Sequence, residues 1–391
     1  MSDSRMSTYK PLPIDLVKGQ GAIVTDSQGQ EYLDALAGIA VCSLGHAHPA
    51  VHEAICEQSK KLLHCSNLYS IAVQHQLADK LTSLSNMDNV FFGNSGAEAN
   101  EAAIKIARLY GHNKDIKNPT IIVMENAFHG RTLATLTASG SRKVQAGFEP
   151  LVQGFIRVPY NDIDAIKSIA ATQSDVVAIL VEPVQGEAGV IVPDKNYLEN
   201  LRTICDDNEW LLMLDEIQTG LCRTGKWFAF QHSDIQPDVM TLAKSLGNGI
   251  PIGACLAKGI AAQTLQPGNH GSTYGGNPLV CATSLAVLGV MESEALYDKS
   301  SKTSQRIVEG FKQRLKDIKG VQEITSFGMM FGIALDRDCP ELMLKALDKN
   351  ILINVTSGNR IRLLPPLIIS DQQADKIVEL VSELVIEFLQ D

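Results

Sequence analysis

Four short apolar runs in the middle of the chain constrain its fold more than any other feature. They are residues 120–124, 176–181, 211–214 and 239–242. Stretches with helical apolar spacing, 163–171 and 195–208, lie between them. Strands that alternate with helices pair in parallel through right-handed crossovers. We therefore expect an α/β fold built on a mainly parallel sheet.

The length of the chain and a change of pattern towards its end predict two domains. A single compact core rarely accommodates 391 residues. In the C-terminal part, long amphipathic stretches over 295–318 and 371–389 surround short strand-like segments. We expect a large domain over residues 45–285 and a smaller α+β domain formed by residues 1–44 together with 286–391.

Local patterns predict further elements. Residues 21–36 have the turn and the flanking apolar residues of a hairpin. Helical spacing recurs in residues 49–63, 74–84 and 97–110. Short strands are expected over residues 89–92 and near 329–335 and 360–364.

Composition and charge exclude several classes of protein. With 45% hydrophobic and 20% charged residues, the chain resembles an ordinary globular protein. It contains no apolar run of the roughly 18 residues that a membrane span needs. The net charge of −10, without a Lys/Arg-rich run, argues against a nucleic-acid partner. The first ten residues lack the apolar segment of a secretory signal, so we expect a cytoplasmic protein.

The eight cysteines are scattered along the chain and form no CxxC pair. This spacing signals neither a zinc site nor a disulfide framework. We expect reduced thiols and no metal.

Lys244 and Asp215 each end an apolar run, which places an amine and a carboxylate at the ends of two buried strands. Open α/β sheets bind their ligands at the carboxyl ends of the strands. A desolvated lysine loses its proton more easily and can attack an aldehyde. An aspartate one strand away could pair with a protonated pyridine nitrogen, as expected for a pyridoxal phosphate enzyme.

Each of these residues alone also fits a structural role. Most lysines are solvated, and an Asp-Glu pair at a strand end commonly caps the next helix. The functional interpretation therefore depends on the set of residues and not on any one of them.

Residues 93–96, with the sequence GNSG, follow a strand and open a helix. The free N–H groups and the dipole of a helix N-terminus attract phosphate. The same residues also fit an ordinary N-cap, with Asn94 or Ser95 as the cap and Glu98 in the first turn. The motif alone does not decide between the two.

Two other motifs carry less weight. Residues 220–226 fit GxxxxGK, but Trp227 stands where a Walker A loop needs Ser or Thr for magnesium. Histidines 46, 48, 52 and 64 lack the Pro-Cys-x-x-Cys partner of a zinc deaminase signature.

Over essentially its full length, the chain resembles the class III (subgroup II) aminotransferases, which depend on pyridoxal phosphate. The most specific block spans residues 211–254 and contains LDEIQTG and TLAKSLGNG. Supporting blocks are NSGAEANEAAIKIAR from Asn94, NAFHGRT from Asn126, VEPVQGEAG from Val181, GSTYGGNP from Gly271 and IRLLPPL from Ile361. The resemblance implies transferase fold type I, with a sheet of the seven-stranded type in the large domain.

The resemblance also implies which residues hold the cofactor. Lys244 would bond to the aldehyde of the cofactor and would then transfer a proton between the substrate carbon and C4′ of the cofactor. Asp215 would keep the pyridine nitrogen protonated. Gln218 would contact the phenolic oxygen and Phe128 would stack on the ring. The remaining cofactor contacts implied are Ser95, Gly96, Ala97, Glu216, Ile217 and Thr273, the last contributed by the partner subunit of a homodimer.

The implied substrate residues suit carboxylates, because a guanidinium binds a carboxylate in a bidentate manner. Arg131 and Arg362 match the two arginines of the family, and Ser272 would lie near the substrate. Glu187 matches a gate that neutralises Arg362 for the first substrate and releases it for the second.

Within the family, the blocks look most like members that transfer the δ-amino group of N2-acetyl-L-ornithine to 2-oxoglutarate in arginine biosynthesis. Ile39 stands where ornithine δ-aminotransferases carry a tyrosine, which argues against free ornithine. Succinylornithine, succinyldiaminopimelate and 4-aminobutyrate stay open as alternative donors. An alternative of a different class is a non-enzymatic ligand-binding protein with an aminotransferase-like fold.

Overall fold

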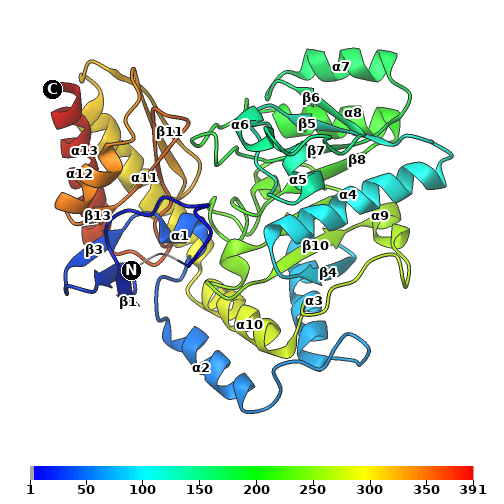
Figure 1. The fold of residues 1–391 in the computed structure, drawn as a ribbon, viewed down its shortest axis with the longest axis horizontal. Coiled ribbons are helices and arrows are strands. Elements are labelled where there is room, and N and C mark those ends of the chain that lie inside the picture. The colour runs from blue at the N-terminus through cyan, green and yellow to red at the C-terminus, as the bar shows by residue number, and fades with distance from the viewer. Residues whose placement is uncertain (1–3, 391) are drawn as a thin grey trace.

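The computed structural model describes residues 4–390, and its central feature is a seven-stranded sheet (Figure 1). The strand order is β4-β10-β9-β8-β7-β5-β6. These strands are β4 (Asn89–Gly93), β5 (Thr120–Met124), β6 (Phe155–Val158), β7 (Val176–Val181), β8 (Leu211–Asp215), β9 (Val239–Leu242) and β10 (Gly253–Ala257). The predicted mainly parallel sheet is confirmed.

Strand β10 is the exception to parallel pairing, and it was not predicted. It pairs antiparallel with both β9 and β4, whereas β5 to β9 pair in parallel. The connection over residues 243–252 is too short for a crossover helix, so the chain returns in the opposite direction. Strand β4, beyond β10, again runs in the direction of the parallel strands.

Alternate residues of the central strands enter two different apolar cores. Ile121 and Val123 pack in a cluster with residues of α4 (Gly96–Asn113), whereas Ile122 and Met124 pack in a larger cluster that includes α8 (Tyr197–Asn208). Because both faces are buried, the strands are continuous apolar runs in the sequence.

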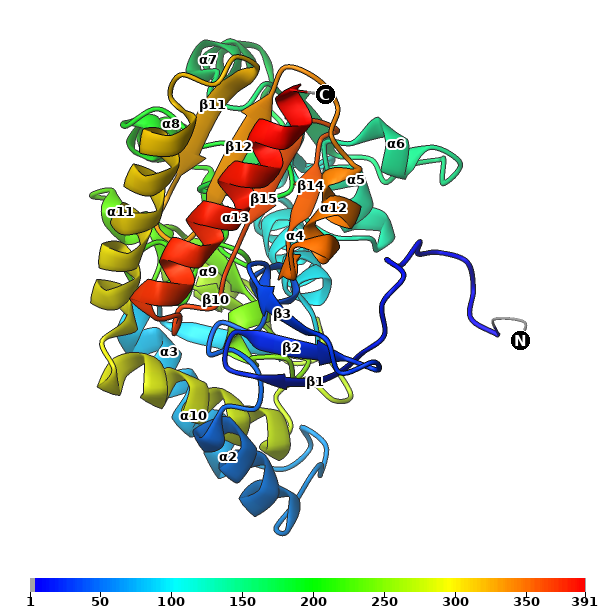
Figure 2. The same ribbon diagram turned by 90° about the vertical axis from the view of Figure 1, so that its left-hand side faces the viewer.

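Two smaller sheets form the other side of the molecule. One has the order β1-β2-β3-β13 and the other β11-β12-β15-β14. Their strands are β1 (Leu16–Gln20), β2 (Ile23–Asp26), β3 (Glu31–Asp34), β11 (Val321–Ser326), β12 (Phe331–Leu335), β13 (Ile351–Leu352), β14 (Asn354–Thr356) and β15 (Arg360–Leu363). Helices α11 (Leu296–Leu315), α12 (Leu342–Asp348) and α13 (Asp371–Gln390) lie beside them (Figure 2).

The predicted helices and the hairpin all form, with ends shifted by a few residues. The remaining helices are α1 (Ala37–Ala40), α2 (Pro49–Ser59), α3 (Ala72–Ser85), α5 (Leu133–Ala138), α6 (Arg142–Gln145), α7 (Ile163–Thr172), α9 (Gly259–Thr264), α10 (Pro278–Ser293) and the 3₁₀ turns η1 (Ala229–His232) and η2 (Lys244–Leu246). Helix α10 was not predicted, and it packs on α2 and α3.

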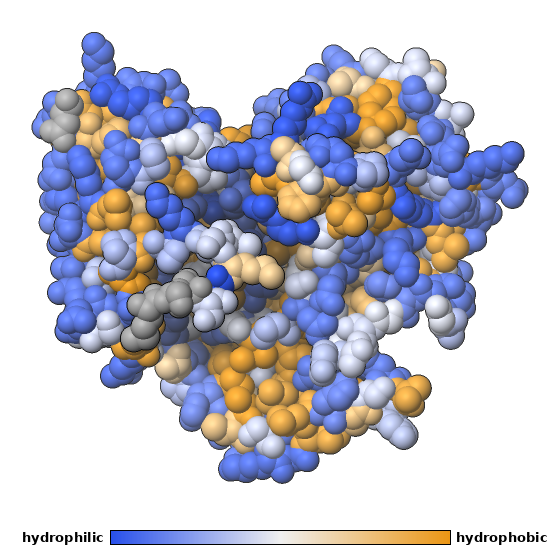
Figure 3. Space-filling model, viewed as in Figure 1, coloured by the Kyte–Doolittle hydropathy of each residue, from blue (hydrophilic) through white to orange (hydrophobic). Residues whose placement is uncertain are grey.

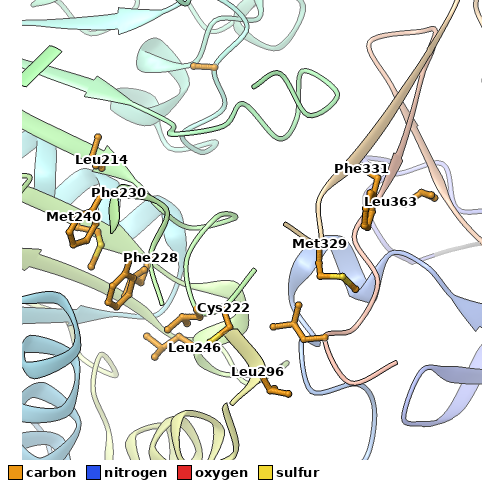
Figure 4. Close-up of a cluster of buried hydrophobic side chains, with 14 of the residues drawn as sticks. Leu214, Cys222, Phe228, Phe230, Met240, Leu246, Leu296, Met329, Phe331 and Leu363 are labelled. Carbon is orange, nitrogen blue, oxygen red and sulfur yellow. The ribbon is translucent and has the colours of Figure 1, made fainter. Parts of the chain in front are cut away.

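The division into residues 45–285 and residues 1–44 plus 286–391 stays a prediction. It is supported by the parallel pairing of β3 with β13, which joins the N-terminal segment to the C-terminal one. One apolar cluster extends from the large sheet, at Leu214 and Met240, to the sheet β11-β12-β15-β14, at Phe331 and Leu363 (Figure 4).

Within residues 4–390, no single helix is long and apolar enough to cross a membrane. Helices α10 and α11 meet that length and composition only when they are taken together as a bent pair.

Candidate active site

A cavity of about 400 Å³ lies where the strands of the large sheet end. Its walls come from the segments that directly follow β4, β5, β7, β8 and β9, because these strands all end at the same edge of the sheet. Nine of the predicted site residues line it: Ser95, Gly96, Ala97, Phe128, Arg131, Asp215, Ile217, Gln218 and Lys244. The structure thus brings together residues that are far apart in the sequence.

Lys244 follows β9 and opens the 3₁₀ turn η2 with a φ of 40°. A non-glycine residue in the left-handed region is strained, and such strain is often retained where a side chain must be aimed at a site. Burial lowers the pKa of Lys244 to about 8, and the charge of Arg362 adds to the effect. The charges of Asp215, Glu187 and Glu182 oppose it. A substantial fraction of this amine is therefore neutral, and hence nucleophilic, near physiological pH.

Asp215 is held by donors that sequence reasoning did not identify. Its Oδ2 lies 2.7 Å from Nδ1 of His129 and accepts from Nδ2 of Asn100 at 2.8 Å. Its Oδ1 accepts from the backbone N–H of Ile217 at 3.1 Å, and Thr241 orients Asn100 through a bond of 2.7 Å. These contacts fix the position of the Asp215 carboxylate at the cavity wall, where it can pair with a cationic group of a ligand.

The N-terminus of α4 faces the same cavity. Ser95 caps the helix, and its Oγ accepts from the N–H of Glu98 at 3.2 Å. The Glu98 carboxylate in turn binds the N–H of Asn94. The N–H groups of Gly96 and Ala97, in the first turn, have no acceptor within the helix. The N-cap interpretation and the anion-site interpretation of residues 93–96 are thus compatible, since capping uses other groups.

Phe128 and Arg131 form another wall. The guanidinium carbon of Arg131 lies 5.6 Å from the centre of the Phe128 ring, and its side chain is exposed. The backbone N–H of Phe128 donates at 3.0 Å to Glu182, a buried carboxylate that lines the cavity. Burial raises the pKa of Glu182 to about 7, although the nearby charge of His129 lowers it.

Gln218 lies against Gly186 at the side of the cavity. A Cβ atom on Gly186 would lie only 2.0 Å from Oε1 of Gln218, so a side chain at this position would displace the Gln218 amide. That Oε1 atom is buried and has no hydrogen-bond partner among residues 4–390. A buried polar atom without a partner indicates a place for a ligand that donates or bridges a hydrogen bond.

Arg362 and Glu187 form an ion pair of 2.8 Å beside this wall. The guanidinium also donates to Gly186 O at 3.0 Å and to Asn354 Oδ1 at 2.7 Å. The Arg362 side chain is 1% exposed and that of Glu187 is 46% exposed. The two predicted gate residues are therefore in contact, next to the glycine on which Gln218 rests.

The chain matches the family model "Aminotransferase class-III" over residues 5–385. The chain belongs to the class III aminotransferases. It is 56% identical to an acetylornithine aminotransferase of Nitrosomonas europaea, over 98% of each chain. It is 44% identical to an acetylornithine aminotransferase of Methanocaldococcus jannaschii, over 98% of this chain and 96% of that relative.

Solved structures agree with this assignment. The ornithine aminotransferase of Toxoplasma gondii ME49 superposes with a TM-score of 0.96 at 33% identity, covering 99% of this chain and 93% of that one. The acetylornithine aminotransferase of Elizabethkingia anophelis superposes with a TM-score of 0.89 at 36% identity, covering 98% and 96%. Both kinds of aminotransferase share this fold, so the fold does not select the substrate.

Class III aminotransferases depend on pyridoxal phosphate, and the cavity fits that cofactor. The lysine amine can bond to its aldehyde, Asp215 can hold its ring nitrogen protonated, and the start of α4 can bind its phosphate. Gln218 lines the same cavity, and its buried Oε1 is without a hydrogen-bond partner among residues 4–390, as expected for a group that awaits a ligand. The predicted enzyme class and cofactor are confirmed.

Five predicted residues do not line the cavity: Arg362 and Glu187 lie beside Gly186, and three others lie elsewhere in this class III aminotransferase. Glu216 does not line the cavity, because consecutive residues at a strand end point to opposite sides. Its carboxylate instead accepts from the N–H groups of Ala229 and Phe230, and burial raises its pKa to about 7. Ser272 bonds to Asn94 of its own chain at 3.1 Å, and Thr273 is exposed and does not line the cavity of its own chain.

Sequence reasoning missed His129, Asn100, Glu182 and Asn354. The first three lie inside the blocks NAFHGRT, NSGAEANEA and VEPVQGEAG, beside residues that were assigned. Their contacts with Asp215 and Phe128 join segments far apart in the chain, so only the folded structure reveals them.

Proposed function

We propose that the chain transfers the δ-amino group of N2-acetyl-L-ornithine to 2-oxoglutarate, giving N-acetylglutamate 5-semialdehyde and L-glutamate in arginine biosynthesis. The observation that carries the proposal is the Arg362–Glu187 pair beside the Lys244 cavity. Such a pair suits an enzyme that alternates between one substrate without, and one with, a carboxylate at the reacting carbon. The names of the relatives at 44–56% identity support N2-acetylornithine as the donor.

The residues of the cavity have complementary roles in this proposal. Pyridoxal phosphate supplies an aldehyde and an electron-withdrawing ring. Lys244 Nζ would hold the aldehyde of the bound cofactor and, when free, would take up and return the proton of the substrate carbon. Asp215, held in position by His129 and Asn100, would hold the proton on the ring nitrogen.

Two arginines recognise the substrates. Arg131, exposed at the cavity wall, binds the carboxylate that every candidate donor carries away from its reacting amine. Glu187 neutralises Arg362 while the amine donor is bound and leaves it when 2-oxoglutarate brings a second carboxylate. An uncompensated buried guanidinium would otherwise be costly.

We also propose a homodimer with shared active sites. Large apolar side chains are exposed on two loops, namely Leu62, Leu63, Leu68, Tyr69 and Tyr274. Asn67 links the loops by donating to the carbonyls of Ser272 and Gly275. The surface over α2 and α10, next to the first loop, is also largely hydrophobic (Figure 3). Exposed apolar patches of this kind mark interaction sites. Thr273 is exposed on the second loop, from which it would contact the cavity of a partner subunit.

The cytoplasm stays the proposed compartment. All eight cysteines are free thiols, as is usual in a reducing compartment.

The visible absorption spectrum of the purified protein tests the proposed donor. The cofactor band is expected to bleach preferentially with N-acetylornithine, compared with 4-aminobutyrate, succinylornithine and free ornithine, and to return with 2-oxoglutarate. Preferential bleaching by another amine would keep the family and reject the proposed donor. A protein that stays colourless after incubation with pyridoxal phosphate would reject catalysis itself.

A further inference from the structure

Strand β14 holds both members of the Arg362–Glu187 pair. It is the edge strand of the sheet β11-β12-β15-β14, and Asn354 lies directly opposite Arg362 in the β14–β15 ladder. Asn354 Oδ1 accepts from Nη2 of Arg362 at 2.7 Å. Thr356 Oγ1 donates to the carbonyl of Glu187, and Ser357 Oγ donates to that of Ala188 at 3.2 Å. Strand β14 and the residue that follows it thus fix the arginine and the backbone of its acidic partner.

The two members of the pair differ in their freedom to move. The Arg362 side chain is 1% exposed, whereas that of Glu187 is 46% exposed. The Glu187 carboxylate can turn towards water. The guanidinium is buried and cannot reach water, so it needs acceptors inside the protein. Because Thr356 and Ser357 hold residues 187 and 188 by their carbonyls, opening requires only a rotation of the Glu187 side chain about a fixed backbone.

After that rotation, Arg362 keeps two acceptors. They are the carbonyl of Gly186, at 3.0 Å from Nη1, and Asn354 Oδ1, at 2.7 Å from Nη2. Both are neutral, so they orient the guanidinium without cancelling its charge. The Nε atom of Arg362 is buried and has no partner among residues 4–390. The fixed arginine therefore keeps its full positive charge, and the place of the Glu187 carboxylate on Nη1 is left open for an incoming carboxylate.

The orientation of the Asn354 amide follows from its neighbours. An arginine can only donate hydrogen bonds, so the atom facing Nη2 must be the amide oxygen. The amide nitrogen then points to the sulfur of Met343, at 3.9 Å. Arg362 and Met343 together therefore fix the orientation of the Asn354 amide, with its neutral oxygen towards Arg362.

We propose that Asn354 is a specificity-determining positioning residue for the second half-reaction. It holds Arg362 in place for the carboxylate of a 2-oxo dicarboxylic acid, and its neutrality leaves the charge of Arg362 available once Glu187 has turned away. The inference rests on the proposed function, because only there must Arg362 meet a second carboxylate after the amine donor has left.

The variants Asn354→Ala and Asn354→Asp test the proposal, with Asn359→Ala as the matched control. Asn359 lies in the turn between β14 and β15, and its amide donates to the carbonyl of Leu335, whereas the amide of Asn354 accepts from Arg362. The two half-reactions are followed separately by stopped-flow absorbance. Calorimetry then gives the Kd of glutarate, a non-reacting dicarboxylate, and of pentanoate, which has the same length and one carboxylate.

Asn354→Asp is expected to weaken glutarate binding and the 2-oxoglutarate half-reaction by about tenfold or more, because a carboxylate neutralises Arg362 permanently. Asn354→Ala, which removes only the positioning bond, is expected to cost about three- to tenfold. In both variants the half-reaction with N-acetylornithine and the Kd of pentanoate should change less than about twofold, as should every value for Asn359→Ala. Asn354→Asp keeps the shape of the side chain, so it carries the test if the alanine variant does not fold.

Equal losses in both half-reactions would mean that Asn354 only supports the fold, and would overturn the proposal. Unchanged glutarate binding in both variants would also overturn it. The variant Arg362→Lys separates this failure from that of the proposed function. If Arg362→Lys weakens the 2-oxoglutarate half-reaction while the Asn354 variants do not, only the role of Asn354 is wrong. If Arg362→Lys has no effect, the gate in the proposed function is wrong.

Discussion

His129 Nδ1 lies 2.7 Å from Asp215 Oδ2, with the two side chains 0% and 4% exposed. Asn100 donates to the same oxygen, and its own orientation is set by Thr241 on the neighbouring strand. The carboxylate at the end of β8 is thus fixed in position by groups from α4, β9 and the segment after β5. Because the carboxylate is buried, its interaction with the cofactor would be little screened by water.

Asp215→Asn is expected to lower kcat by about 1000-fold, or about 4 kcal/mol, because the amide cannot hold a proton on the ring nitrogen. The cofactor should still bond to Lys244, so the protein should stay coloured. Steady-state kinetics and the absorption spectrum measure the two effects. Asp164→Asn is the control, since that side chain on α7 is 96% exposed, and it should leave kcat and the absorption spectrum unchanged. A variant at position 215 that kept more than about a tenth of the activity would contradict this role.

The rate at which the apoenzyme takes up pyridoxal phosphate should depend on the pKa of Lys244. Only the neutral amine attacks the aldehyde, and burial lowers this pKa to about 8. The rate should therefore rise about tenfold per pH unit below pH 8 and level off above it. Stopped-flow absorbance between pH 6 and 10 measures the profile. A rate that climbs steadily to pH 10 would mean that Lys244 titrates like a solvated lysine.

Gly186→Ala should displace Gln218 and disturb the Arg362 contact made by the Gly186 carbonyl. The added Cβ would lie 2.0 Å from Oε1 of Gln218, and such a contact cannot form without movement. The expected result is weaker cofactor binding, by about tenfold or more in Kd, measured by dialysis and fluorescence. Gly289→Ala on α10 meets no atom within 4 Å and serves as the control. Equal cofactor affinity in both variants would show that the close packing at Gly186 is not needed.

Mixed dimers test whether Thr273 acts in the cavity of the partner. Thr273→Ala and Lys244→Ala homodimers should each have low activity, because each lacks a group in both sites. Refolding the two variants together should restore one intact site, formed by the Lys244 of one chain and the Thr273 of the other. If Thr273 instead served its own chain, the mixed dimers would gain no activity. Differently tagged subunits allow the mixed species to be purified and assayed.

The sequence predicts those parts of this fold that depend on local pattern. Strands β5, β7 and β9 form over the expected residues, since fully buried strands are continuous apolar runs. Lys244 and Asp215 could be placed together because both end such runs in one sheet. The three-residue strand β14 has no comparable signal, and the antiparallel direction of β10 depends on the return path of the chain.

The direction of individual side chains is the other feature that the sequence pattern does not predict. Asp215 and Glu216 are adjacent in the sequence, yet one lines the cavity and the other binds the start of η1 at residues 229–230. The support of Asp215 by His129, 86 residues away, is a tertiary contact that no periodicity encodes. Asn354 was missed for the same reason, since its partner is set by strand register.

Borohydride trapping followed by peptide mass spectrometry tests the central claim most directly. Reduction of the coloured enzyme should leave the mass of the cofactor on Lys244 and on no other lysine. Addition of N-acetylornithine before the reduction should remove that label, and further addition of 2-oxoglutarate should restore it. A label on a different lysine, or one that N-acetylornithine does not remove from Lys244, would contradict the account.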